Sequence, residues 1–173
     1  MTPSQKKIAL HRFLAFAVDW LIIALWGSLL VGVVMWIYSA QPPAPSGPWH
    51  GQLIGFCSMT LPVVLYFSIC EASAWRASIG KKVLSLRLIG SPEKPVAFSR
   101  VLLRNLIKFA PWELGHSVAQ QAIFAGSSTA AWLSVPMVLS LLVPVWWVVS
   151  IYLRGVAPYD QVVGISVVSR LES

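Results

Sequence analysis

Residues 13–38 read FLAFAVDWLIIALWGSLLVGVVMWIY, an apolar run of 26 residues with one charged side chain, Asp19. A helix of about 20 apolar residues crosses the hydrocarbon core of a bilayer, so this run predicts a membrane span. The apolar core of a secretory signal is only about 7–15 residues long, so we expect the run to be retained in the protein. It predicts the fold class, an all-α membrane protein.

The whole chain has the composition of a membrane protein. Apolar residues make up 57% of its 173 residues and charged residues only 11%, which is too apolar for a soluble domain. We therefore expect one membrane domain over residues 1–173, in contact with the lipid bilayer. The net charge of +7 does not predict nucleic-acid binding, because the basic residues flank apolar runs, where anionic lipid headgroups are the nearer counter-charge.

Further apolar runs predict further spans. Residues 52–75 and 131–153 are long enough to cross a bilayer, and Pro62 predicts a kink in the first of these runs. Residues 111–126 make only about 24 Å of helix at roughly 1.5 Å per residue, so we expect a third span that is tilted, kinked or partly re-entrant. The sequence thus predicts a four-helix transmembrane bundle.

The distribution of basic residues predicts the orientation. All 13 Lys and Arg residues lie outside the two segments 38–51 and 117–131, which connect consecutive spans. Short loops rich in Lys and Arg stay in the cytoplasm. We therefore expect the N-terminus and the C-terminus to be cytoplasmic.

Residues 99–110 predict an amphipathic helix at the membrane interface. The leucines of this segment gather on one arc of a helical wheel, and the other arc carries Arg100, Arg104, Asn105 and Lys108. Pro111 followed by Glu113 is typical of a helix start. We therefore expect a new helix to begin at Pro111.

Two short segments predict a small β element. Within residues 82–89, Leu84, Leu86 and Leu88 alternate with polar or solvent-tolerant positions, which is the period of a strand. Residues 165–169 are rich in β-branched side chains. Because a lone strand leaves its edges unpaired, we expect the two segments to pair on the cytoplasmic surface.

Three of the six carboxylates, Asp19, Glu71 and Glu113, lie within or at the inner end of apolar segments. A charge near the centre of a span costs about 2.5–3.5 kcal/mol on insertion scales, so each needs a partner, a wet cavity or a proton. Arg12 lies on the same helix face as Asp19 but about 10 Å along the axis, so we expect a third group between them. Two hypotheses stay open for Asp19, a structural contact inside the bundle and an ion or proton site.

Metal and enzyme chemistry have weak support. Glu113 and His116 are three residues apart on one helix face, a spacing that suits metal ligands or a proton relay. No third ligand accompanies them, so we expect a polar pair rather than a metal site. The sequence has no Gly-rich phosphate loop and no nucleophile elbow. We therefore expect no enzyme activity and no cofactor.

Four blocks of sequence carry a family resemblance. Residues 11–19 read HRFLAFAVD, 78–87 SIGKKVLSLR, 103–108 LRNLIK and 159–164 YDQVVG. In this order they resemble the RDD family of small, mostly bacterial membrane proteins, which is named for one Arg and two Asp residues. The resemblance implies a multi-pass protein of the bacterial plasma (inner) membrane.

The resemblance also implies which residues carry the family's name: Arg12, Asp19 and Asp160. The chain departs from the family pattern at Ser78-Ile79, where Thr-Pro is usual, and at Tyr159, where His is usual. Cation/proton antiport has been associated with some members of the family and assembly of membrane complexes with others.

The candidate ion or proton site therefore consists of Asp19, Arg12 and Asp160. Asp160 is expected to neutralise Arg12 at the cytoplasmic edge and to leave Asp19 at the closed end of an inward-facing polar cleft. The expected lining of that cleft is Glu71, Arg104, Lys108, Glu113 and His116.

Two functions follow as hypotheses. The first is a small transporter that exchanges cations for protons at Asp19, working as a homo-oligomer because four helices are few for alternating access. The second is a non-transporting scaffold or assembly factor for a partner membrane protein. In that case the three charged residues only hold segments of the chain together.

Overall fold

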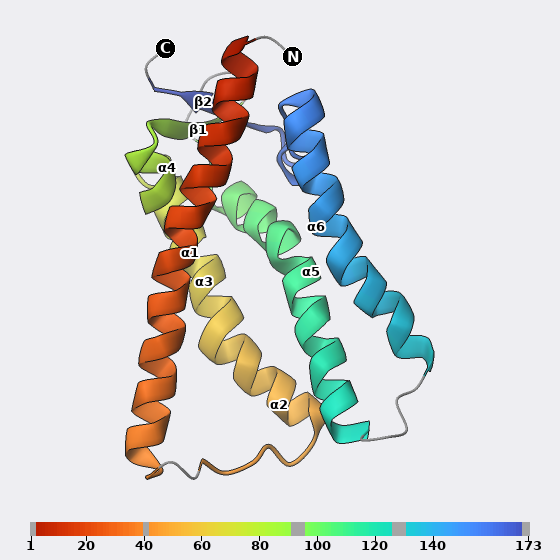
Figure 1. The fold of residues 1–173 in the computed structure, drawn as a ribbon. Helices are drawn as coiled ribbons and strands as arrows, with labels where there is room; N and C mark the ends of the chain where they lie inside the picture. The colour runs from red at the N-terminus through yellow and green to blue at the C-terminus, as the bar shows by residue number, and fades with distance from the viewer. Residues whose placement is uncertain (1–2, 40–41, 91–95, 126–130, 171–173) are drawn as a thin grey trace.

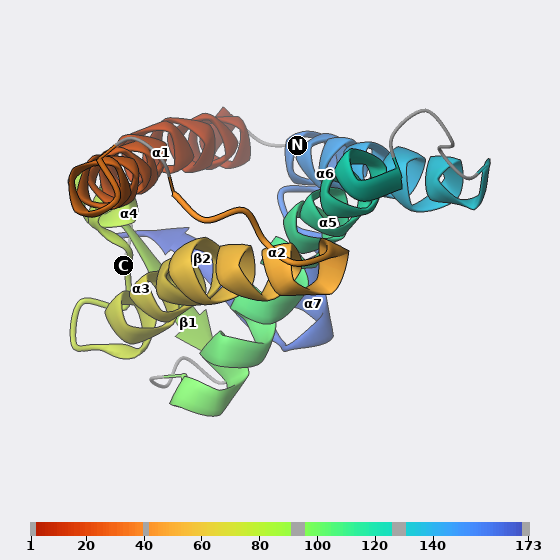
Figure 2. The ribbon, with the colours of Figure 1, turned by 90° about the horizontal axis from the view of Figure 1, so that it is seen from below.

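The computed structural model of the protein describes residues 3–39, 42–90, 96–125 and 131–170. Long helices run side by side, and a small sheet lies at the end of the molecule where the first helix begins (Figure 1). The long helices are α1 (Pro3–Ile37), α2 (Pro48–Gly55) with α3 (Leu61–Ala72), α5 (Phe98–Ala125) and α6 (Ser134–Arg154). Seen along the bundle, α1 and α6 lie on one side and α2 and α3 on the opposite side (Figure 2).

Three helical segments are long and apolar enough to cross a membrane, counted over the described residues: Gln5–Ile37, Pro48–Ala72 and Ala131–Arg154. Helix α5 lies beside them (Figure 1) but is not one of the three. The expected all-α membrane fold is therefore present, with three candidate spans where the sequence predicts four. Each of the three leaves most of its apolar surface exposed, as contact with lipid requires.

The second span is interrupted where the sequence predicts a kink. A π-helical turn at Phe56–Thr60 joins α2 to α3, just before Pro62. Proline has no N–H and cannot bond the carbonyl four residues earlier, which here belongs to Ser58. That carbonyl accepts a hydrogen bond from the indole Nε1 of Trp26 at 2.9 Å instead. The proline thus changes the helical turn and also attaches α1 to the second span.

The predicted helix start at Pro111 is wrong. Helix α5 is continuous from Phe98 to Ala125 and contains Pro111 in its interior, so residues 99–110 and 111–126 form one element. Proline removes one hydrogen bond from a helix. Helix α5 packs against α2, α3 and α6, and this packing offsets the lost bond.

The predicted pairing of two short strands is confirmed. Strand β1 (Leu86–Gly90) pairs antiparallel with β2 (Ile165–Ser169), with Leu86 opposite Ser169 and Gly90 opposite Ile165. The first strand begins later than expected, because residues 79–83 form the short helix α4 (Ile79–Val83). The side chain of Ser78 caps α4 by accepting a hydrogen bond from the backbone N–H of Lys81.

One face of this sheet closes a core against the start of α1 and α5. Its buried apolar side chains include Leu86, Leu88, Val101, Ile165 and Val167, together with Ala15 of α1. A second short helix, α7 (Pro158–Val162), lies between α6 and β2 in the chain. Helices α4 and α7 therefore carry their side chains to the same end of the bundle, where the charged residues gather.

Candidate functional site

The charged residues of this end form one connected network, and Asp160 is its first link. Its two carboxylate oxygens accept hydrogen bonds from Arg12 Nη2 at 2.5 Å and from Arg104 Nε at 2.6 Å. The three residues come from α7, α1 and α5. The carboxylate of Asp160 is fully buried, and the two guanidinium groups compensate its charge and satisfy both of its oxygens.

Glu71, at the end of α3, is the second link. Its oxygens accept hydrogen bonds from Arg104 Nη1 at 2.9 Å and from Lys81 Nζ at 2.6 Å. Asn105 Nδ2 donates to the same carboxylate at 3.0 Å. Arg104 therefore bridges both acids, and the network ties α1, α3, α4, α5 and α7 together.

Asp19 lies in this region but does not contact Arg12. Its carboxylate accepts hydrogen bonds from Tyr66 Oη at 2.9 Å, Ser78 Oγ at 2.6 Å and the backbone N–H of Gly80 at 2.8 Å. None of these groups also bonds Arg12, whose carboxylate partner is Asp160, so the third group expected between Asp19 and Arg12 is not among the partners of Asp19. Asp19 instead fastens the start of α4 to α1.

Gly80 is required at this contact. A Cβ atom on Gly80 would lie 2.0 Å from the carbonyl oxygen of Ala15 and 2.9 Å from Cγ of Asp19. No side chain fits at that distance. The glycine lets the backbone of α4 approach α1 closely enough for its N–H to reach Asp19.

Burial and neighbouring charges shift the pKa values of Asp160 and Tyr159. Burial alone would raise the pKa of Asp160, but Arg104 and Arg12 outweigh it and hold that pKa below its usual value. Tyr159 is its neighbour in α7, and burial together with the charge of Asp160 raises the pKa of the Tyr159 phenol. At neutral pH Asp160 is therefore ionised and Tyr159 is not.

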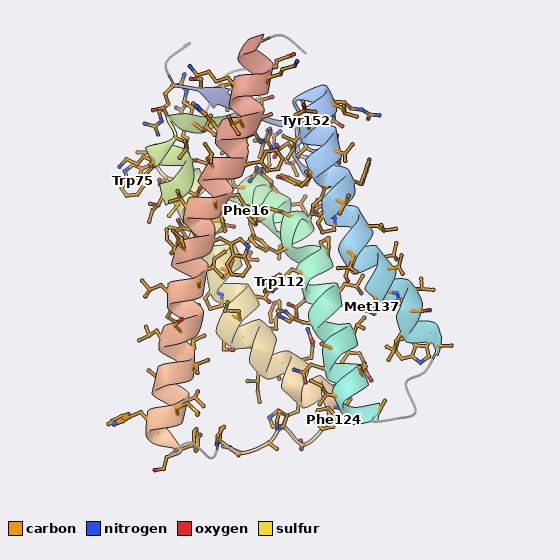
Figure 3. The ribbon with its side chains drawn as sticks, in the orientation of Figure 1. Phe16, Trp75, Trp112, Phe124, Met137 and Tyr152 are labelled. Carbon is orange, nitrogen blue, oxygen red and sulfur yellow. The ribbon has the colours of Figure 1, made fainter. Side chains whose placement is uncertain are left out.

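A cavity of about 270 Å³ lies beside the network, between α1, α5 and α6. Five charged side chains line it: Arg12, Asp19, Lys81, Arg104 and Lys108. The rest of the wall is mostly aromatic and aliphatic and includes Phe16 and Trp112, which lie between α1 and α5 in Figure 3. The cavity thus joins a charged end to an apolar wall.

The expected lining of the polar cleft is met only in part by the residues around this cavity. Arg104 and Lys108 line it, whereas Glu71 is bonded to Arg104 and Lys81 and does not line it. Glu113 and His116 do not line it either. Glu113 accepts hydrogen bonds from Gln52 and from Thr60, the latter at 2.5 Å, and its nearest oxygen is 4.0 Å from His116 Nδ1. Glu113 therefore joins α5 to the second span in a separate polar contact.

Several residues of the network carried no signal as single positions. Lys81 and Asn105 are buried polar partners of Glu71, although the sequence places Lys81 in a basic loop and Asn105 on a solvated arc. Ser78 and Gly80 are donors to Asp19. All four lie in the blocks 78–87 and 103–108, which carry the family resemblance. These blocks, and not the residue types, were the sequence feature that could have pointed to the four residues.

Comparison with known proteins gives one match. A model of the RDD family matches residues 9–150, a range that includes most of α1, both halves of the second span, α4, β1 and α5. No curated protein and no solved structure matches the chain. The match covers most of the chain, and the chain therefore belongs to the RDD family of small membrane proteins.

Proposed function

We propose that this protein is a small transport protein of the bacterial inner membrane, with both termini in the cytoplasm, and that its solute enters the cavity between α1, α5 and α6. The observation that carries the proposal is the cavity itself, a space of about 270 Å³ with charged groups at one end. Buried charges within membrane helices are costly and are typical of solute and ion pathways.

Exchange of a cation for a proton at Asp19 has mixed support. Asp19 is the one carboxylate among the residues that line the cavity, which favours it as the exchanging group. Three hydrogen bonds already satisfy its oxygens, however. A cation would also have to approach past Lys81, Arg104 and Lys108. The geometry supports transport better than it supports this particular exchange.

Two neighbouring valines of α6 allow a matched test of transport. Val148 lines the cavity and Val149 does not, and their exposed fractions are 45% and 44%. Val148→Trp should fill the cavity, and Val149→Trp should only enlarge the outer surface of the helix. In proteoliposomes with a trapped pH-sensitive dye and an imposed pH gradient, sodium, potassium and phosphate salts are added in turn.

We expect protein-dependent flux with at least one of these salts, lost in Val148→Trp and kept in Val149→Trp. Flux that both variants support equally would contradict passage through this cavity. Absence of flux with every salt would contradict the transport proposal and favour the scaffold.

The scaffold function has its own supporting observation. The second half of α1 packs little against the rest of the described chain, and Leu21, Leu25 and Trp36 are 72%, 71% and 84% exposed. Such a face suits lipid, a second copy or a partner membrane protein. Light scattering of the purified protein in detergent tests for a second copy. A dimer or larger species that Leu25→Trp dissociates supports an interface on α1. A monomer contradicts a stable homo-oligomer.

A further inference from the structure

The charges around the cavity do not balance. Four cations, Arg12, Lys81, Arg104 and Lys108, lie in or against the network, whereas its carboxylates are the three residues Asp19, Glu71 and Asp160. With every Lys and Arg protonated, one positive charge is left over. Arg12, Lys81 and Arg104 are buried and Lys108 is half-buried. An uncompensated charge at such a place is unfavourable, and either the loss of its proton or a counter-ion relieves it.

The surplus charge lies at Lys108. Arg12, Lys81 and Arg104 each bond a carboxylate directly. Lys108 has no hydrogen-bond or ion-pair partner among the described residues. Its Nζ lies 3.8 Å from the centre of the Phe67 ring and 4.9 Å from that of Phe109. Aromatic faces attract an ammonium group, but they leave its N–H donors without an oxygen acceptor.

The protein cannot supply that acceptor by a small rearrangement. Asp19 lines the same cavity, but both its oxygens accept from Tyr66, Ser78 and Gly80. Glu71 and Asp160 each bind two cations. Among the described residues no carboxylate is left for Lys108, and a bound anion would supply the acceptor that it lacks.

The rest of the wall indicates what else that group carries. Beyond the charged end the cavity is lined by Phe16, Phe109, Trp112, Trp147 and Val148. Its volume of about 270 Å³ is far above the roughly 10–15 Å³ that a single water molecule needs. That is room for one acidic head and a short apolar segment, and the wall favours the apolar segment over water.

We propose that the cavity binds an anionic amphiphile, with its phosphate or carboxylate head at Lys108 and its apolar chain between α1, α5 and α6. This inference rests on the cavity of the proposed function and names the class of its ligand. The head can belong to a membrane lipid or to a free solute with the same chemistry.

Calorimetry with defined probes tests the proposal. The full chain is placed in phosphatidylcholine nanodiscs and titrated with octyl phosphate, with inorganic phosphate and with octyltrimethylammonium, and empty nanodiscs correct for partitioning. We expect octyl phosphate to bind and octyltrimethylammonium not to bind. Lys108→Gln should weaken octyl phosphate binding about tenfold or more, because a hydrogen bond to a charged group is lost.

Two variants complete the comparison. Lys108→Arg keeps the charge and should retain most of the affinity. Lys82→Gln removes a charge from an exposed lysine of α4 that lies over Trp75, away from the cavity, and should bind as the unaltered protein does. Equal affinity in Lys108→Gln and the unaltered protein, or preference for octyltrimethylammonium, overturns the proposal. The second result needs no variant, so it decides the matter even if Lys108→Gln does not fold.

Further arms separate the sources of the anion and the two proposals. If native mass spectrometry finds phosphatidylglycerol bound to the protein and octyl phosphate displaces it, the anion is a lipid. If inorganic phosphate binds and its binding depends on Lys108, the anion is a free solute. Either keeps the anion site. If octyl phosphate binds at Lys108 but no salt flux is seen, the transport proposal is contradicted and the anion site is kept. If Val148→Trp blocks a salt flux but neither octyl phosphate nor phosphate binds, the anion site is contradicted and the transport proposal is kept.

Discussion

Among single residues, Gly80 and Asp160 are the most constrained by their surroundings. Gly80 is held by distance, since its backbone lies against Ala15 and Asp19. Asp160 is constrained by charge, since its carboxylate is buried and ion-paired with both Arg12 and Arg104. A small substitution at either residue should therefore have a clear effect on the stability of the protein.

Gly80→Ala should destabilise the protein strongly. The new Cβ would meet the backbone oxygen of Ala15 at 2.0 Å, so α4 must move away from α1 and the bonds to Asp19 must lengthen. Overpacking of this kind typically costs about 1–3 kcal/mol. The thermal midpoint in detergent, followed by fluorescence-detected size exclusion, should fall. Gly32→Ala is the control, because nothing lies within 4 Å of the Cβ it would add, and it should keep its midpoint; an unchanged midpoint in Gly80→Ala would show that α4 and α1 do not pack as described.

Stability should fall in acid, and Asp160 should account for part of the loss. The pKa of Asp160 is lower in the folded protein than its usual value, so its contribution is present above about pH 4, the ordinary range of an aspartate. It is lost as the pH falls from there through the folded pKa. Asp160→Asn should cost about 3–5 kcal/mol at neutral pH, since it leaves buried cations without a counter-charge.

The measurement is chemical unfolding of the unaltered protein and of Asp160→Asn at several pH values between about 3 and 7, a range that includes the ordinary pKa of an aspartate. The difference between the unaltered protein and Asp160→Asn should shrink toward acid. A difference that stays constant with pH would show that Asp160 is not ionised in the folded state.

At the scale of elements, prolines decide how the helices join. Pro62 leads to a π-helical turn and frees the carbonyl of Ser58 for Trp26, so a break in one helix becomes a contact between two. Pro111 has no such effect on the course of α5, which continues through it. Both residues lack a backbone N–H, so the interruption near Pro62 and the continuity at Pro111 come from the surroundings of each proline.

A double-mutant cycle tests the contact at Pro62. Trp26→Phe should cost about 0.5–1.5 kcal/mol, because the carbonyl of Ser58 loses its donor. Pro62→Ala restores a backbone N–H that can bond Ser58 within the helix, so Trp26→Phe in that background should cost little. Unfolding of the four proteins in mixed micelles gives the coupling energy. Additive effects would mean that the indole N–H does not replace the missing bond.

At the scale of the whole molecule, the basic residues and the fold agree on one polarity. Helices α4 and α7 and the sheet lie at the end where α1 begins, and the C-terminal end of α1 and that of α5 lie at the other end (Figure 1). The segments without Lys or Arg connect elements at that other end. Charge and topology thus point to the same sidedness.

Cysteine labelling tests this sidedness in spheroplasts. With Cys57 and Cys70 replaced by Ser, a cysteine at the exposed Ser46, in the connection before α2, should react with a membrane-impermeant maleimide from outside. A cysteine at the exposed Ser166, on β2, should react only after lysis. External labelling at Ser166 would reverse the orientation.

The sequence alone determined the class of the protein, three of its spans, the pairing of two strands and the family. These follow from hydropathy, period-two alternation and ordered sequence blocks, which are properties of contiguous residues. The same local rules misplaced a helix start at Pro111, because they take no account of the contacts that α5 makes with α2, α3 and α6.

Only the tertiary structure decided which charges meet. Arg104 joins Glu71 to Asp160 across 33 and 56 positions of chain, and Lys81 is buried although it stands in a basic segment. Nothing in a local pattern encodes a partner at such separation. The unpaired state of Lys108 likewise depends on Arg12, Lys81 and Arg104 pairing with Glu71 and Asp160, and on Asp19 bonding Tyr66, Ser78 and Gly80. Pairing is a property of the whole set of neighbours in a region of low dielectric, and it becomes visible only when the helices are assembled.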